Sequence, residues 1–568
     1  MSVNSEGPVG DDTYRRLGLP PYAWLMETNT AANAACLNGT RCATNFVGPE
    51  GLAASFNRSV WRSKGEVVST EQRAFSNNGA VKRPGSCSPP SNPCYVSNTG
   101  YGPNVNVMRS PQFGRNSEMV GEDPFLSGSY AREMVGEQQR EDAHGHPRMM
   151  VYLKHYTTYT LDCRVGGPPP KRTPTSHCDT DNNVISQFDY MDTYLPQYHM
   201  AMEGSPREFS GAGGVMCGYS AENNHPSCAN DFLLNKVLRE RWHRPDAVVT
   251  TDCAAIGHLT SGPAFAPSNG VAAAWGLNNG SDIDCGSMYF HIPGAVAAGQ
   301  TTEAMVDKSL SRSLTHLFRL GYFDPVETVE WAKIGAEVID SPRHRAMNFE
   351  AALQSVALLR NDKGVLPLKP GRQVAVLGPL ADARHQLMSG YTSMQPCAND
   401  INQTQDSCIW SIAAAVRYYN GDPSLTTNAS GIDVNSTDTS RIPAALALAR
   451  AADVVVLALG TDNSIEAEGV ERFDISLPGQ QLNFAPQVIA LGKPTVVVTV
   501  SGGQLAIDSV ATTGNSVAIV NAFNPCIIGM KAVAAQVFGR YNRWGRLPYT
   551  IFNSSYMDED PAAPWEFD

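Results

Sequence analysis

The sequence predicts an α/β protein of two large domains, a (β/α)8-type barrel followed by an open α/β sandwich. The chain has 568 residues, and single hydrophobic cores stop growing at roughly 250–300 residues, so two domains are expected. Short apolar runs alternate with helical stretches up to about residue 320, and the pattern restarts after a polar stretch. We therefore expect a barrel domain over 1–322, a linker over 323–345 and a sandwich domain over 346–568.

Three apolar runs in the first domain read as buried strands that end in polar residues, at 215–220, 247–253 and 281–285. Segments with the apolar spacing of helices lie between and beside them, at 232–242 and 271–279. In a barrel of parallel strands, chemistry takes place at the carboxyl ends of the strands. The polar residues at these ends are therefore candidates for function.

The second domain is expected to contain a mostly parallel sheet. Its β-branched runs, which are typical of buried strands, lie at 374–380, 453–460, 494–503 and 516–523. Helical segments between them lie at 442–451, 477–492 and 529–539. Two polar stretches rich in Pro, Ser and Thr, 163–185 and 395–440, are interpreted as surface insertions.

Composition narrows the class of protein. Hydrophobic residues make up 42% of the chain and charged residues 17%, which is typical of a globular protein. The formal net charge of −12 argues against nucleic acid as a partner, because an acidic surface repels phosphates. No apolar run approaches the roughly 18 residues that a membrane span needs, so no membrane association is expected.

The thirteen cysteines indicate disulfides and an oxidising compartment. No C-x-x-C pair has a matching partner, so no metal site is expected. Sequence alone does not fix connectivity, but five pairs enclose short loops: Cys36 and Cys42, Cys87 and Cys94, Cys163 and Cys178, Cys217 and Cys228, and Cys397 and Cys408. Seven N-x-S/T sequons agree with secretion. The first residues, MSVNSEGPVGDD, are not a signal peptide, so we expect a secreted protein whose chain here begins downstream of its true start.

Several residues at strand ends could carry chemistry. Asp252 ends a strand and is either a structural cap or a site residue. Lys154 and His155 lie near the end of the run VYLKHY. Because buried lysine is rare unless it is paired, a lysine beside a histidine at a strand end favours a functional role for both. Tyr219 by itself is more typical of a core residue.

Two acidic residues in the second domain lie just past the strand at 453–460. These are Glu466 and Glu468, in the segment NSIEAEGVER. Taken alone, this segment is best interpreted as a solvated acidic loop.

A set of segments in the same order resembles glycoside hydrolase family three, and most closely its β-xylosidase/α-L-arabinofuranosidase branch. The segments, which extend over nearly the whole chain, are GRNSEMVGEDPFLSGSYA, YLKHYTTYTLD, VMCGYSAENNHPSCANDFLLNKVLRERW, VVTTDCAAIG, GSDIDCG, SVALLRNDKGVLPLK, SIEAEGVERFDISLPGQQ and VFGRYNRWGRLPYTIF. The resemblance implies a retaining exo-acting β-glycosidase that removes terminal β-D-xylosyl residues from xylo-oligosaccharides.

The resemblance also implies roles for single residues. Asp252 matches the nucleophile, and Glu468 matches the general acid/base in a Glu-Gly-x-Asp-Arg loop, in which Glu471 here replaces the Asp. Glu466 is the rival for the acid/base role. The residues that match sugar-binding positions are Glu27, Tyr101, Arg115, Lys154, His155 and Tyr219. Paired cysteines of the branch match Cys217 with Cys228 and Cys253 with Cys285.

The implied chemistry needs two carboxyl groups in different protonation states and no metal or cofactor. Arg115 and Lys154, if near, are expected to lower the pKa of Asp252 and keep it ionised. The pKa of the acid/base carboxyl is expected to be raised, so that it holds a proton at working pH.

The chain also departs from the family. Only fifteen residues precede RLGLPPY (16–22), where the family has its first barrel strand and helix, so we expect a barrel that is incomplete at its N-terminal end. We also expect the fibronectin-like third domain of the branch to be absent. Two alternatives stay open: a β-glucosidase of the same family, and a catalytically impaired relative that binds sugar.

Overall fold

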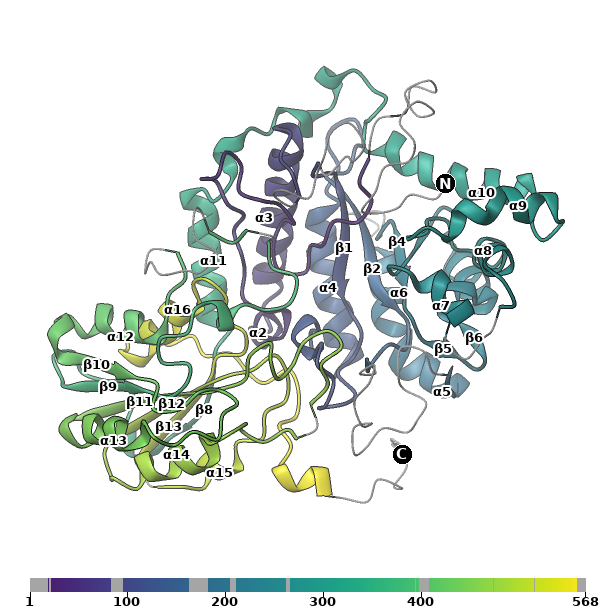
Figure 1. Cartoon of the computed structure of the whole chain (residues 1–568). Helices are drawn as coiled ribbons and strands as arrows, with labels where there is room; N and C mark the ends of the chain where they lie inside the picture. Colours follow the sequence, from purple (N-terminus) through teal and green to yellow (C-terminus); the bar gives the residue numbers. More distant parts are fainter. Residues whose placement is uncertain are drawn as a thin grey trace.

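The structure, a computed structural model, describes residues 19, 22–82, 95–162, 182–204, 211–261, 266–393, 395–397, 408–472, 474–514 and 516–558. It contains two α/β units, each built around a largely parallel sheet (Figure 1). The predicted class, an α/β protein with a parallel barrel-type sheet followed by a second α/β sheet, is confirmed.

The first sheet is parallel and has the strand order β1-β2-β4-β7. Its strands are β1 (Thr99–Asn104), β2 (Met150–Tyr156), β4 (Gly214–Cys217) and β7 (Val248–Thr251). Single parallel bridges extend it at both edges, from Glu27 to Tyr101 and from Thr250 to Ile283. The Tyr101 hydroxyl on one edge strand lies 2.8 Å from Thr250 Oγ1 on the other. The sheet therefore curls on itself, as a barrel does.

Helices cover the outside of this curled sheet in Figure 1. They are α2 (Pro49–Ala54), α3 (Arg58–Asn77), α4 (Pro124–Gln138), α5 (Gln187–Asp189), α6 (Pro196–Glu203), η4 (Phe232–Arg241), α7 (Ala255–Ser261), α8 (Asn269–Asn278), α9 (Ile292–Ala297) and α10 (Glu303–Arg319). Capping residues mark the start of some of them: Asp123 caps α4 by accepting a hydrogen bond from Leu126 N, and Pro124 occupies the first helical position. A small sheet of β3 (Asn182–Asn183), β5 (Ala221–Glu222) and β6 (His225–Pro226) lies beside them.

The second sheet has the order β10-β9-β11-β12-β13-β8, and only its last strand is antiparallel. Its strands are β8 (Ala357–Asn361), β9 (Val374–Leu377), β10 (Thr426–Ala429), β11 (Val454–Gly460), β12 (Thr495–Val500) and β13 (Val517–Asn521). The helices packed with it are α11 (Pro342–Gln354), α12 (Ile412–Asn420), α13 (Ile442–Ala451), α14 (Gln481–Ile489), α15 (Asp508–Ala511) and α16 (Gly529–Val537).

The interpretation of 395–440 as a surface insertion is wrong for residues 412–429, which contain α12 and β10. The apolar face of α12 is buried in the core of the second domain, although the helix is only nine residues long. Asn420 at its C-terminal end accepts from Gly371 N at 3.0 Å and so ties it to the neighbouring loop. A short helix and a four-residue strand inside a polar stretch show too little hydrophobic periodicity to be predicted from the sequence.

The two domains meet through shared apolar clusters. In one cluster, Phe46, Leu52 and Tyr130 of the first domain pack with Ala532 and Ala535 of α16. A second cluster brings Met108, Phe113 and Tyr159 of the first domain together with Phe523 and Tyr549 of the second. Buried contacts of this kind resemble a domain core, so the two domains are packed firmly against each other.

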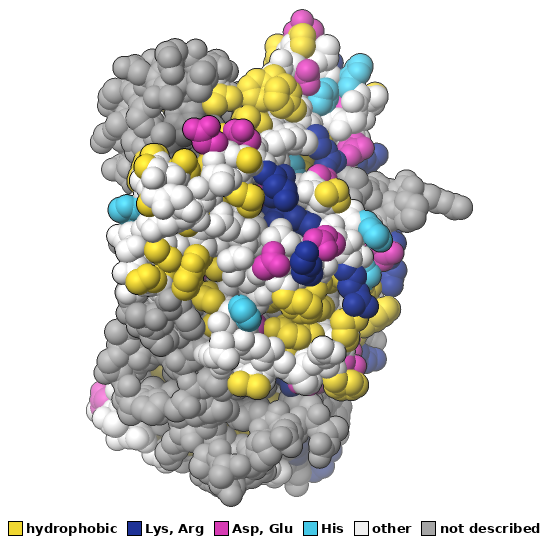
Figure 2. Space-filling model, turned by 90° about the vertical axis from the view of Figure 1, so that its right-hand side faces the viewer, with side chains coloured by type: hydrophobic (Ala, Val, Ile, Leu, Met, Phe, Trp, Pro, Cys, Tyr) yellow, Lys and Arg dark blue, Asp and Glu magenta, His cyan; other side chains and the backbone are white. Residues whose placement is uncertain are grey.

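Figure 2 shows the side of the molecule that carries α8, α9 and α10, with acidic and basic side chains interspersed on its described part. Ion pairs of this domain include Arg312 with Asp282 at 3.0 Å and Arg319 with Glu141 at 3.3 Å. None of the helices that the structure describes is long and apolar enough to cross a membrane.

The described residues contain four disulfides: Cys36–Cys42, Cys217–Cys228, Cys253–Cys285 and Cys397–Cys408. Cys526 is a buried free thiol. The expected pairs Cys87–Cys94 and Cys163–Cys178 lie outside the described residues.

Candidate active site

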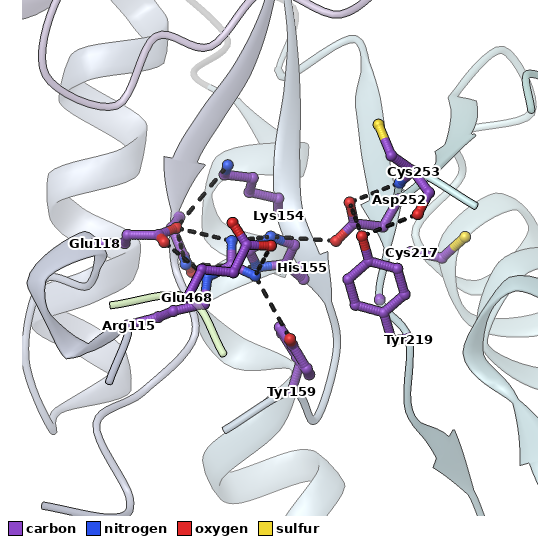
Figure 3. A network of polar contacts seen from close by, with 12 residues as sticks. Arg115, Glu118, Lys154, His155, Tyr159, Cys217, Tyr219, Asp252, Cys253 and Glu468 are labelled. Atoms are coloured by element: carbon purple, nitrogen blue, oxygen red, sulfur yellow. Dashed lines mark hydrogen bonds and ion pairs between the residues drawn. The ribbon is translucent and has the colours of Figure 1, made fainter. Parts of the chain in front are cut away.

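Lys154 and His155 lie at the carboxyl end of β2, where the sheet loses its regular register. The pairing of β2 shifts against β1 between Tyr101 and Asn104, and against β4 between Leu153 and Tyr156. Such irregularities re-aim the side chains that they contain. Both side chains are buried, and Figure 3 shows them among the polar residues of the cluster.

A chain of alternating charges is built around Arg115. Its guanidinium holds Glu118 with two contacts, Nε to Oε1 at 2.7 Å and Nη2 to Oε2 at 3.1 Å. Glu118 Oε2 lies 4.0 Å from Lys154 Nζ, which donates to Glu27 Oε2 at 2.7 Å. Burial raises the pKa of Glu27, although Lys154 opposes the shift. Pairing of this kind allows several charged groups to stay buried together.

His155 is neutral in this setting. Its burial, helped by the charges of Arg115 and Lys154, holds its pKa well below the usual value. Nδ1 lies 3.3 Å from the amide oxygen of Asn106, so Nδ1 carries the proton, and Nε2 accepts from Arg115 Nη2 at 3.1 Å. The 3.5 Å approach of His155 Nε2 to Asp252 Oδ2 is therefore not an ion pair.

Asp252 follows β7 and is held at one oxygen only. Oδ1 accepts from the Tyr219 hydroxyl at 3.1 Å and from Cys253 N at 2.7 Å. Oδ2 is buried and, among the described residues, has no hydrogen-bond partner. The bond between Cys253 and Cys285 joins the next residue to the neighbouring segment, with the two Cα atoms 4.5 Å apart. The carboxylate is thus fixed in place with one oxygen left bare.

Glu468 reaches the same cluster from the second domain. Its Oε1 lies 3.3 Å from Arg115 Nη1, and its Oε2 accepts from the Tyr391 hydroxyl at 3.0 Å. The side chain stays 53% exposed. Figure 3 shows it beside Arg115, Lys154 and His155, with Asp252 beyond His155. The cluster therefore has carboxyl groups from both domains.

The expected directions of the two pKa shifts are wrong in this structure. Burial raises the pKa of Asp252, and the opposing charges of Arg115 and Lys154 do not outweigh it. Burial also acts to raise the pKa of Glu468, but Arg115, the Tyr391 hydrogen bond and Lys154 together lower it below its usual value. The two shifts differ because the two carboxyl groups lie in different surroundings. Asp252 is 8% exposed and has one oxygen without a partner, whereas Glu468 lies near water and is paired with Arg115.

Glu466 faces the interior of its own domain instead of the cluster. Its Oε1 accepts from the Thr461 hydroxyl and from Gly502 N, the latter at 2.6 Å. Its Oε2 lies 3.6 Å from Arg472 Nη1. These contacts tie the loop to the second domain.

Tyr101, whose backbone pairs with that of Glu27, has its side chain in the core of the curled sheet, and the structure adds two residues to the cluster. The Tyr101 ring is fully buried in the core of the curled sheet, where its hydroxyl contacts Thr250. Glu118 was within reach of sequence reasoning, since it follows Arg115 in a segment already singled out. Tyr391 had no signal of its own, yet its ring lies 4.0 Å from Lys154 Nζ.

Within the described residues, no group of three or more His, Cys, Asp and Glu side chains is placed to hold a metal ion. What the cluster offers is a bare carboxylate oxygen, a second carboxyl group near solvent, and several charged or polar donors between them. Charge-assisted donors of this type bind hydroxyl groups well.

Comparisons with family models and with known proteins give matches over most of the chain. Residues 96–316 match the glycosyl hydrolase family 3 N-terminal domain, and residues 356–563 match the family's C-terminal domain. An exo-1,4-β-xylosidase of Emericella nidulans is 33% identical over 96% of this chain and 67% of its own length. A probable exo-1,4-β-xylosidase of Neosartorya fischeri is 32% identical over 96% of this chain, which spans 66% of that relative's length.

Solved structures share the fold. An exo-β-xylosidase of glycoside hydrolase family 3, in complex with a xylobiose aziridine activity-based probe, has a TM-score of 0.85 and 29% identity, covering 97% of this chain and 67% of its own. A β-glucosidase from Erythrobacter marinus has a TM-score of 0.76 and 25% identity, covering 92% of this chain and 66% of its own. The matches to both family domains and to these relatives show that the chain belongs to glycosyl hydrolase family 3.

Proposed function

We propose that this protein is a retaining exo-acting β-glycosidase that releases terminal β-D-xylosyl residues from xylo-oligosaccharides. The observation that carries the proposal is the arrangement of two carboxyl groups around Arg115. Asp252 is held in place with one oxygen free of hydrogen bonds among the described residues, and Arg115 lies near it. Glu468 of the other domain contacts the same Arg115. The exo-β-xylosidases among the relatives support the choice of sugar. In support of an oligosaccharide substrate, one of these is bound to a xylobiose-based probe.

In this proposal Asp252 is the nucleophile. Its Oδ2 attacks the anomeric carbon and the glycosidic bond breaks, which leaves a xylosyl-enzyme ester. Tyr219 and Cys253 N hold Oδ1, so the carboxylate does not have to reorient during the attack. Water then cleaves the ester and regenerates the carboxylate.

Glu468 is the proposed acid and base. It gives its proton to the departing oxygen in the first step and takes one from the attacking water in the second. Glu466 is the weaker candidate because its two oxygens are directed to Gly502, Thr461 and Arg472 of its own domain. Glu468, in contrast, contacts Arg115 in the cluster.

The active protonation state has an ionised Asp252 and a protonated Glu468, the reverse of what their pKa shifts favour in the free enzyme. The two groups share Arg115 as a neighbour, so their titrations belong to the pair. A sugar that fills the space around Glu468 would exclude water from it and raise its pKa. Substrate binding would then help to put the proton on the acid.

The proposed sugar-binding groups lie around the two carboxyl groups. Glu27, Arg115, Lys154 and His155 are buried, and Tyr219 is partly buried. Tyr101 is the weakest of the predicted contacts, because its hydroxyl is already used by Thr250 in the core. Its predicted role would need a rearrangement of that contact.

We further propose that the domain boundaries lie at 322 and 346 and that the protein acts outside the cell. The first boundary is supported by the end of α10 at Arg319, whereas α11 already begins at Pro342, four residues before the second boundary. Secretion is supported by the four disulfides. Four sequon asparagines are exposed: Asn38, Asn428, Asn435 and Asn553.

The test is to compare turnover of p-nitrophenyl β-D-xyloside and p-nitrophenyl β-D-glucoside. A preference for the xyloside with retention at the anomeric carbon supports the proposal. A preference for the glucoside would favour the second candidate, a β-glucosidase such as the Erythrobacter marinus neighbour. Binding of xylose without turnover of either substrate would favour an impaired relative.

A further inference from the structure

Glu468 lies at the tip of a tight turn that is closed by two backbone hydrogen bonds. Val470 N donates to Ala467 O at 2.9 Å, and Ala467 N donates to Val470 O at 3.3 Å. Gly469, the third residue of the turn, has φ +69°, a conformation that favours glycine. A turn of this kind sets the backbone around Glu468 but does not by itself fix where the turn points.

Asp162 of the first domain binds this turn through a hydrogen bond. Its Oδ2 accepts a hydrogen bond from Gly469 N, the residue directly after Glu468, at 2.8 Å. Its Oδ1 accepts from the hydroxyl of Tyr159, a residue that also lies 3.5 Å from Arg115 Nη1. The side chain is only 4% exposed. Both carboxyl oxygens of Asp162 therefore accept hydrogen bonds from residues next to the site.

Glu471 of the second domain makes the reciprocal contact. Its Oε2 accepts from Gly114 N at 2.9 Å, and its Oε1 accepts from Asp162 N at 2.5 Å. Gly114 directly precedes Arg115, the partner of Glu468. Glu471 is only 2% exposed, so these hydrogen bonds are shielded from water.

We propose that Asp162 and Glu471 are positioning residues that form a latch between the domains and hold Glu468 in register with Arg115. Asp162 accepts one backbone N–H from the opposite domain and Glu471 accepts two, and each is bound next to a residue of the site. The inference rests on the proposed function for its catalytic consequence. The latch itself is a structural claim that can be measured without a substrate.

Two further observations support the latch. Gly114 packs so closely under the turn that a Cβ atom there would lie 2.0 Å from Val470 O and 2.4 Å from Ala467 O. Burial also raises the pKa of Asp162 to about 7 and that of Glu471 to about 9. Neutral carboxyl groups add no negative charge beside Glu468, so at acidic pH the latch can lie against the acid/base without repelling it.

The substrate-independent test is hydrogen exchange of peptides that contain residues 466–472, in wild type and in Asp162→Ala. We expect the Gly469 amide to exchange at least roughly tenfold faster in the variant, because its hydrogen bond is lost. Asp162→Asn, which keeps an acceptor oxygen, should restore most of the protection. Unchanged exchange in Asp162→Ala would overturn the latch whether or not the protein hydrolyses xylosides.

The catalytic test measures kcat/KM, which reports the first step, on xylobiose and on an activated aryl xyloside in Asp162→Ala, Glu471→Ala and Gly114→Ala. We expect at least a tenfold larger loss on xylobiose, because a displaced Glu468 no longer protonates a poor leaving group. Equal losses on both substrates would overturn the positioning role. If wild type hydrolyses neither substrate, the proposed function fails while the exchange experiment still decides the latch.

Two control variants separate positioning from loss of stability. Glu222 is another buried carboxyl group of the first domain whose pKa burial raises to about 7, but its hydrogen bonds stay within that domain. Glu222→Ala should lower stability without changing the ratio of the two kcat/KM values. Gly294→Ala, where a Cβ meets nothing within 4 Å, is the matched control for Gly114→Ala. A ratio that changes in either control would overturn the interpretation.

Discussion

Asp252 and Glu468, the two proposed catalytic carboxyl groups, are held in opposite ways. Asp252 follows β7 in the first domain, is buried, and is held by hydrogen bonds from Tyr219 and Cys253 of the same domain and by a neighbouring disulfide. Glu468 lies at the tip of a turn, is half exposed, and reaches the site only because its loop is docked on the other domain. The difference suggests that the nucleophile depends on the first domain alone, whereas the acid/base depends on the contact between the domains.

The largest effect is expected from removal of the nucleophile. Asp252→Ala should lower turnover by roughly four orders of magnitude or more, because no other group takes over the attack. Added azide should restore part of the turnover in this variant and not stimulate wild type. Substantial activity in Asp252→Ala without azide would contradict the assignment.

Removal of the acid/base should act selectively. Glu468→Gln is expected to slow the hydrolysis of xylobiose by roughly 10²–10⁴-fold, because protonation of its poor leaving group is lost. The first step on activated aryl xylosides should be slowed far less. The measurement is kcat/KM on both substrates. Glu466→Gln is the comparison variant, and a leaving-group dependence there instead would transfer the role to Glu466.

Loss of the disulfide beside Asp252 tests how firmly the nucleophile is held. The Cys253→Ser, Cys285→Ser variant opens a loop with a sequence separation of 32 residues. We expect it to lose about 3–4 kcal/mol of unfolding free energy on the chain-entropy account. A shift of Asp252 near 1 Å would cost on the order of a hundredfold in rate.

The matched control is Cys36→Ser, Cys42→Ser, which opens a loop with a separation of only 6 residues. It should lose about 2 kcal/mol and leave kcat unchanged. Denaturant unfolding and steady-state kinetics measure both quantities. An unchanged kcat in the Cys253, Cys285 variant would show that β7 holds the nucleophile without the bridge.

The contact between the domains should weaken as pH rises. Burial raises the pKa of Asp162 to about 7 and of Glu471 to about 9, above their values in an unfolded chain, with Arg115, Glu468 and Glu118 as charged neighbours. The folded state therefore keeps protons that the unfolded chain releases. The contribution of these two groups to the free energy of unfolding is complete at low pH and is lost as pH rises through about 7 and then about 9. Glu471→Gln, which has no proton to lose, should flatten the decline.

Thermal unfolding midpoints between pH 5 and pH 9.5 in wild type and Glu471→Gln measure this effect. Parallel curves for the two proteins would mean that Glu471 does not titrate in this range.

The smallest effect is expected at Tyr391. Its hydroxyl donates to Glu468 and helps to lower the pKa of that carboxyl group. Tyr391→Phe removes the donor, so the pKa of Glu468 should rise and the basic limb of the kcat/KM profile should move to higher pH. A basic limb that stays in place or moves to lower pH would argue against Glu468 as the acid.

Much of this site could be predicted because its residues follow buried strands or belong to recognisable segments. Arg115, Lys154, His155, Tyr219 and Asp252 are found together in the structure, and Glu468 reaches them across the interface. Tyr391 could not be predicted, because its place depends on how the second domain docks.

The protonation states could not be predicted either. Sequence identifies the neighbours that would shift a pKa but not the depth of burial, and burial is the largest influence on the pKa of Asp252. The contacts of Asp162 and Glu471 are likewise long-range, joining residues more than three hundred positions apart.

The most direct test of the central claim is to trap the covalent intermediate. The protein is incubated with a 2-deoxy-2-fluoro-β-xyloside that carries a good leaving group, digested, and mapped by mass spectrometry. The account predicts one 2-fluoroxylosyl label per chain, on Asp252, with none in Asp252→Ala. A label on another carboxyl group, or turnover of xylosides without any trapped ester, would contradict it.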